Sequence, residues 1–301
     1  MQTRLRYLCG AAVLLAGLAA FEYLRTPETA AVAAVTTVPA TTQPAAAVAA
    51  ASTVAVAVLA PATIAEPGLV EQVDRLIASR DPVKAYAAFT LINDCATYNR
   101  DHDRMVYDLA EVQSKRSMLP YRAMTDAEKR HDAVLCAGMS ERMRLSRIDY
   151  LAIAAKAGVR GAAIEMAQEG PFGDPSALLS RPDDPLVQEW KRTVLDQLTN
   201  SAENGDMGTL AYLWAKEVMG DPITGKHPAL AYRYVVAQGL IMRDLMGPDD
   251  LGAVMYGPDG GLARDIEGLT TEQRAVELAA AQRIAEAARE QRKRARHEGG
   301  A

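Results

Sequence analysis

Aromatic side chains are scarce in this chain of 301 residues: Phe, Trp and Tyr make up 5% of it, although 49% is hydrophobic. Alanine is the commonest of the apolar residues. Alanine is the strongest helix former and lets helices pack closely, and segments that alternate with the period of a strand are few. The composition therefore predicts an all-α fold.

The chain also lacks the surplus of positive charge that nucleic-acid-binding proteins carry. It has 33 Lys and Arg against 38 Asp and Glu, which gives a net charge of -5 and an isoelectric point near 5.5. Binding to a phosphate backbone depends mainly on Lys and Arg. We therefore expect no nucleic acid among the partners.

Motifs of the common catalytic classes are missing. The chain contains no Gly-x-Ser-x-Gly and no His-Glu-x-x-His, and the turn at residues 257–261 lacks the Lys-Ser/Thr of a phosphate loop. The hexapeptide at residues 99–104 gathers His102 with acids and bases, which is typical of a solvated loop. We expect a protein that is not an enzyme and has no cofactor; the alternative is an envelope enzyme or enzyme subunit with a polar site near Asp101 to Arg104.

Cysteine is rare, with three residues in the chain. Cys9 lies in the apolar N-terminal segment, whereas Cys95 and Cys136 lie on expected helices of a domain that would meet an oxidising compartment. We predict a disulfide between Cys95 and Cys136; the alternative is two buried thiols. No close Cys or His pair accompanies them, so no metal site is expected.

Residues 1–25 form a membrane-targeting segment. Arg4 and Arg6 precede an uncharged apolar run that begins at Tyr7 and ends at Phe21. Its length lies between that of a signal-peptide core and the roughly 20 residues that span a bilayer. We favour an uncleaved signal anchor, hence an inner-membrane, single-pass protein with a periplasmic domain. The alternative is a secreted or periplasmic protein after cleavage of a signal peptide.

Residues 26–66 consist almost entirely of Ala, Val, Thr and Pro, with Glu28 and Glu66 as the charged residues. The prolines prevent a continuous helix and favour extended conformations. We interpret this segment as a disordered linker, whose roughly forty residues would reach on the order of 100 Å.

Residues 67–298 carry the signals of an all-helical domain. Asp81-Pro82 and Asp184-Pro185 each combine a cap residue with a first-turn proline, and Thr125 to Glu128 forms a capping box. Thr270 to Gln273 caps a last helix, and a further helix is expected around Arg104 to Arg116. One apolar face is expected to carry Trp190, Val194, Leu198 and Ala202. Hairpin patterns of strands are not expected in this domain.

Two segments of the domain repeat each other at an offset of 47 residues, 151–175 and 198–222. The matched positions are Leu151 with Leu198, Ala155 with Ala202, Gly158 with Gly205, Met166 with Leu213, and Gly173 with Gly220. The first glycine of each pattern is expected to end a helix in a left-handed turn, and the second to end the next helix. A repeated helix-turn-helix buries its apolar face by stacking on its neighbours.

At these residues the sequence resembles the Sel-one-like repeats, which are relatives of the tetratricopeptide repeats. The first unit supplies Ala154, Ala155, Gly158, Ala162, Met166, Ala167 and Gly173, and the second supplies Ala202, Gly205, Leu213, Gly220 and the stretch from Ala229. Gly170 and Glu217 stand where the family has tyrosine, and Trp214 replaces a small residue. The resemblance, over about 145 to 240, implies an α-solenoid that scaffolds or docks proteins and has no catalytic residues.

Four aromatic residues gather in and after the second unit, and we interpret them as candidate anchors for a binding partner, although half of them are expected to lie in the core. They are Tyr212, Trp214, Tyr232 and Tyr234. The basic stretch at 289–298 suits a helix C-terminus, and we expect it to be a solvated end; the alternative is attraction to anionic material of the envelope. Together these features predict a membrane-tethered, exported, non-catalytic protein-protein interaction or scaffold module of the cell envelope, whose partner is another envelope protein.

Overall fold

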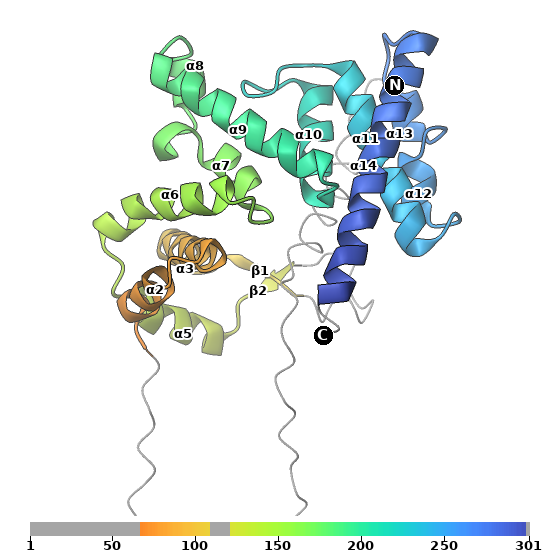
Figure 1. Cartoon of the computed structure of the whole chain (residues 1–301). Helices are drawn as coiled ribbons and strands as arrows, with labels where there is room; N and C mark the ends of the chain where they lie inside the picture. The colour runs from red at the N-terminus through yellow and green to blue at the C-terminus, as the bar shows by residue number, and fades with distance from the viewer. Residues whose placement is uncertain (1–66, 109–120, 299–301) are drawn as a thin grey trace, which may run out of the picture. The chain divides into compact units, whose positions relative to one another are not determined.

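The computed structural model of the chain describes residues 67–108 and 121–298 (Figure 1). The expected membrane-targeting segment at 1–25 and the expected linker at 26–66 lie outside the described residues. Within the described residues, no helix is both long enough and apolar enough to cross a membrane.

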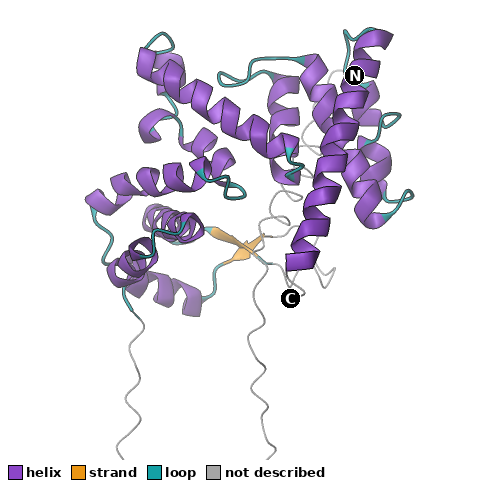
Figure 2. Cartoon of the chain, viewed as in Figure 1, coloured by secondary structure: helices purple, strands orange, loops and turns teal. Residues whose placement is uncertain are grey.

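The described residues are mainly helical, as the composition predicted (Figure 2). The first half contains α2 (Leu69–Ala78), α3 (Pro82–Arg100), α5 (Asp126–Cys136), α6 (Glu141–Lys156), α7 (Ala162–Glu169), the 3-10 turn η1 (Pro171–Gly173) and α8 (Ala177–Ser180). The second half contains α9 (Pro185–Glu203), α10 (Met207–Met219), α11 (Pro228–Met246), α12 (Leu251–Tyr256), α13 (Gly261–Arg264) and α14 (Thr271–Glu298).

The capping residues begin the helices where the sequence predicted. Asp81 accepts a hydrogen bond from Val83 N at 2.8 Å, and Asp184 accepts one from Leu186 N at 2.9 Å. The Thr125 capping box is present, and Thr270 caps α14 by accepting from Gln273 N at 3.1 Å. Because each cap satisfies amide groups that the first turn leaves without partners, short local patterns suffice to place these helix starts.

The expectation of a helix around Arg104 to Arg116 is wrong at its start. Met105–Tyr107 is strand β1, which pairs antiparallel with β2 (Tyr121–Ala123) in the only ladder of two strands among the described residues (Figure 2). Residues 109–116 of the expected helix lie outside the described residues. No hairpin pattern in the sequence pointed to these strands. They form because pairing with a segment about 16 residues downstream in the chain overrides the local helical pattern.

Three apolar clusters hold the helices together. One surrounds Cys95 and Cys136 and joins α2, α3 and α5, and a second places Phe89 of α3 against Leu151 of α6. The largest lies among α7, α9, α10, α11 and the helices after it. Helix α11 contacts α10, α12, α13 and α14, so it is the element around which this last cluster is built (Figure 1). The predicted face of α9, Trp190, Val194, Leu198 and Ala202, is buried in it.

Candidate binding site

The two glycines matched at an offset of 47 residues occupy the same kind of turn. Gly158 has a φ of 73° and Gly205 a φ of 79°, so both adopt the left-handed conformation that the sequence predicted. The Gly158 amide donates to Ala155 O at 3.0 Å, and the Gly205 amide donates to Ala202 O at 2.8 Å. The next amides, of Val159 and Asp206, donate to Ala154 O at 3.0 Å and to Ser201 O at 3.1 Å. Both helix ends therefore make the same pair of hydrogen bonds.

The second glycine of the pattern differs between the two segments. Gly220, with a φ of 83°, ends α10 as expected. Its counterpart Gly173 ends the short 3-10 turn η1 and not α7, because α7 ends at Glu169 and is followed by its cap residue Gly170, which has a φ of 74°. A Cβ on Gly170 would lie 2.3 Å from Pro175 Cα, so the chain folds tightly back here and α7 is shorter than α10.

The two left-handed turns and the C-terminal half of α14 line a cavity of about 570 Å³. Its buried apolar lining comes from Ala155, Ala163, Met207, Ile241 and Ala288. Its exposed polar lining comes from Lys156, Arg160, Asn200, Asn204 and Gln291. The cavity thus has a buried apolar floor under an exposed polar rim.

An ion pair between two residues of the cavity lining joins the first unit to the second. Arg160 Nε donates to Asp206 Oδ2 at 2.9 Å. The other oxygen of Asp206 accepts from Thr209 N at 2.8 Å, so the same carboxylate caps α10 and holds Arg160. The guanidinium remains half-exposed while the carboxylate is mostly buried. Arg160 is thus held at the rim with part of its surface open to solvent.

Helix α14 approaches the second turn closely. A Cβ on Gly205 would lie 2.3 Å from Ala288 Cβ, so only glycine fits here without displacing α14. A Cβ on Gly158 meets nothing within 4 Å. The contact carries Gln291 and Arg292, which lie one turn beyond Ala288, to the wall of the cavity.

Comparison of the chain with models of known families, with curated proteins and with solved structures found no match. The resemblance to Sel-one-like repeats therefore stays a prediction, and the geometry of the chain itself is what indicates its function.

The four candidate aromatic anchors do not form an exposed binding surface. Trp214, Tyr232 and Tyr234 are buried in the largest apolar cluster, where Trp214 packs edge-on against Tyr256 with ring centroids 5.8 Å apart. Tyr212 is partly buried against the same cluster, and burial raises the pKa of its hydroxyl, with a smaller contribution from Asp221. Large aromatic side chains are commonly buried in the core of a protein's own fold. The prediction that these residues form a binding surface is corrected accordingly.

A buried carboxylate that the sequence analysis noted only as a departure from the repeat pattern lies in the same helix as Tyr212 and Trp214. Glu217 is 3% exposed, and its Oε2 lies 2.8 Å from His227 Nδ1 across the loop between α10 and α11. Burial raises the pKa of this carboxyl, and the hydrogen bond with His227 opposes the shift. The His227 side chain is half-exposed, so the pair anchors the loop at the protein surface.

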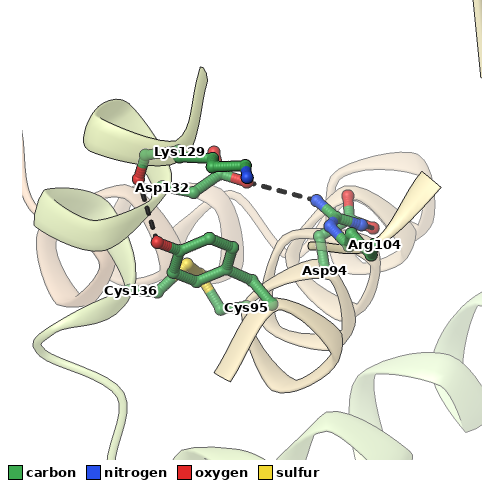
Figure 3. The surroundings of a disulfide bond; sticks show 7 residues. Asp94, Cys95, Arg104, Lys129, Asp132 and Cys136 are labelled. Carbon is green, nitrogen blue, oxygen red and sulfur yellow. Dashed lines mark hydrogen bonds and ion pairs between the residues drawn. A yellow bond between two sulfur atoms is a disulfide. The ribbon is translucent and has the colours of Figure 1, made fainter. Parts of the chain in front are cut away.

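Ion pairs join the polar hexapeptide at 99–104 to neighbouring helices. Arg104 contacts Asp132 at 3.2 Å and Asp94 at 3.6 Å (Figure 3). Asp103 pairs with Lys129. His102 is exposed and its ring packs edge-on against Tyr98. These ion pairs tie the end of α3 to α5.

The predicted disulfide is present in the structure. Cys95 of α3 and Cys136 at the end of α5 are bonded with an S–S distance of 2.02 Å (Figure 3). Both residues are buried, and Tyr98 beside them donates from its hydroxyl to Lys129 O at 2.9 Å. The bond therefore joins two helices that also share an apolar cluster. Among the described residues no group of three or more His, Cys, Asp and Glu suits a metal ion.

Proposed function

We propose that this protein is a membrane-tethered, exported interaction module of the cell envelope, in which the cavity between the two matching turns binds a segment of another protein. Residues 1–25 would anchor it in the inner membrane and residues 26–66 would let the helical domain reach away from the bilayer. The two helix-turn-helix units would be degenerate Sel-one-like repeats that form a short solenoid.

One observation carries this proposal. Two turns of the same hydrogen-bonding pattern, 47 residues apart, contribute to a single cavity with a buried apolar floor and an exposed polar rim. Helical repeats stack so that equivalent positions line one continuous surface, and such surfaces bind extended partners.

The rim suits the chemistry of a polypeptide. Amide side chains both donate and accept hydrogen bonds, and Asn200, Asn204 and Gln291 present them from two different helices. A main chain offers N–H and C=O groups at regular spacing, and these need partners of both kinds.

Site-specific photo-crosslinking tests the proposal. A photoreactive residue replaces Asn200 or Gln291 of the full-length chain in intact membranes, and a control chain carries it at Val134. Val134 is 80% exposed on α5 and does not line the cavity. We expect the same protein to be captured from positions 200 and 291 and to be missing from position 134. Capture of the same proteins from all three positions, or from none, would remove the cavity as the binding site.

A further inference from the structure

The cavity is cationic although the chain is acidic. Lys156, Arg160 and Arg292 line it together with a single acidic residue, Asp206, in a chain of net charge -5. Lys156 is exposed and makes no ion pair with the described residues. The carboxylate of Asp244 pairs with two cations, Arg289 at 2.6 Å and Arg292 at 3.7 Å. Positive charge therefore exceeds negative charge at this site.

The positive charge continues along α14. Ala288, Arg292 and Arg296 follow each other at intervals of four residues, so they lie on the same helical face. Ala288 and Arg292 line the cavity, and Arg296 lies one turn further on, exposed. A ligand that leaves the cavity over α14 therefore meets a further cation.

We propose that the cavity binds an acidic stretch of an extended polypeptide, with Lys156, Arg160 and Arg292 pairing with its carboxylates. The inference rests on the proposed function and adds the chemical class of the partner segment. Carboxylates form charge-assisted hydrogen bonds with guanidinium and ammonium groups, and these are stronger than neutral ones.

The lining favours a polypeptide over an anionic membrane surface. The apolar floor at Ile241 and Ala288 is buried below the rim, where the flat face of a bilayer does not reach. Gln197 also lines the cavity, and its Oε1 is buried without a hydrogen-bond donor among the described residues. A buried acceptor of this kind is unusual, and a main-chain N–H of a bound peptide would supply the donor that it lacks.

Binding of defined probes to the full-length chain in phosphatidylcholine nanodiscs tests the inference. Fluorescein-labelled deca-glutamate is the probe, and deca-lysine and deca-glutamine are its counterparts; anisotropy is measured at low and at physiological ionic strength. We expect deca-glutamate alone to bind, and to bind more weakly as salt increases. The variant Lys156→Gln/Arg160→Gln/Arg292→Gln should lose about tenfold in affinity, as the sum of three charge pairs near the surface.

Two further variants distinguish binding at the cavity cations from a general effect of the protein's charge. Lys84→Gln/Arg130→Gln/Arg142→Gln removes the same charge from exposed cations of α3, α5 and α6 that do not line the cavity, and it should bind like the unchanged chain. Lys156→Glu breaks no ion pair of the described residues and should by itself weaken binding of deca-glutamate.

The outcomes distinguish this inference from the proposed function. An equal loss of affinity for deca-glutamate in the two triple variants, or no binding of deca-glutamate, would overturn the inference that the partner segment is acidic. This holds even where crosslinking at positions 200 and 291 succeeds. Binding of phosphatidylglycerol vesicles that requires the three cavity cations, without binding of deca-glutamate, would replace it with a lipid surface. Failure of the crosslinking itself would instead remove the proposed function.

Discussion

Gly205 and Ala288 are in such close contact that a methyl group on the glycine would lie 2.3 Å from the methyl group of the alanine. One residue belongs to the turn between α9 and α10, and the other to α14, more than eighty positions along the chain. The contact brings α14 to the cavity, where Gln291 and Arg292 form part of the lining. This part of the lining therefore depends on the absence of a side chain at Gly205.

Substitution at the two matched glycines should therefore have unequal effects. Gly158→Ala meets open space and should cost only the backbone penalty of a positive φ, about 1 kcal/mol. Gly205→Ala pays the same penalty and also displaces α14, which should add about 1 to 3 kcal/mol. Urea unfolding of residues 67–301 measures both. Equal losses at the two positions would mean that α14 does not pack on this turn.

The disulfide should account for a large part of the stability of the first helices. It closes a loop between residues separated by 41 positions, for which loss of chain entropy in the unfolded state predicts about 4 kcal/mol. Cys95→Ser/Cys136→Ser should therefore lower the unfolding midpoint in urea strongly, and dithiothreitol should lower that of the unchanged protein but not that of the variant. Mass spectrometry of exported protein without reduction should find the two cysteine peptides linked; free thiols at both positions would contradict the prediction.

Replacement of Glu217 should change how stability depends on pH. Because burial raises the pKa of this carboxyl, the folded protein holds its proton more tightly than the unfolded chain does. The stability that this group contributes is present below its ordinary pKa and is lost as pH rises through the raised value. Glu217→Gln keeps an acceptor for His227 and removes the charge, so its stability relative to the unchanged protein should increase with pH over this interval.

Chemical unfolding of both proteins at several pH values between 4 and 8 measures that difference. Glu217→Ala is the matched control, because it removes the charge and leaves His227 Nδ1 without this partner. A difference between the unchanged protein and Glu217→Gln that does not vary with pH would show that the carboxyl titrates alike in the folded and unfolded states.

The topology predicted from the first 25 residues has a direct test. Arg4 and Arg6 before an apolar run should keep the N-terminus in the cytoplasm and export the remainder. A reporter that is active only outside the cytoplasm, fused after residue 300, should be active, and a reporter that is active only in the cytoplasm should not. The reverse pattern would overturn the proposed location.

Local patterns in the sequence predicted most of the helix boundaries. Asp81, Thr125, Asp184 and Thr270 mark helix starts because a cap satisfies amide groups within its own first turn. Local patterns did not predict the strand at Met105–Tyr107, because its hydrogen-bond partners are at Tyr121–Ala123. Of the candidate site residues, the cysteine pair was predicted correctly. Of the four candidate aromatic anchors, Trp214, Tyr232 and Tyr234 are buried in the core and Tyr212 is partly buried, where half were expected in the core.

The sequence by itself determined the helical class, the cap residues and the left-handed turns at Gly158 and Gly205, because each depends on the conformational preferences of a few neighbouring residues. Tertiary structure alone decided that Trp214 and Tyr234 are buried and that Glu217 meets His227. It also decided that Arg160 and Arg292 share one cavity. The physical reason is that burial and pairing depend on which helical faces meet, and those faces come from segments that the chain brings together only when it folds.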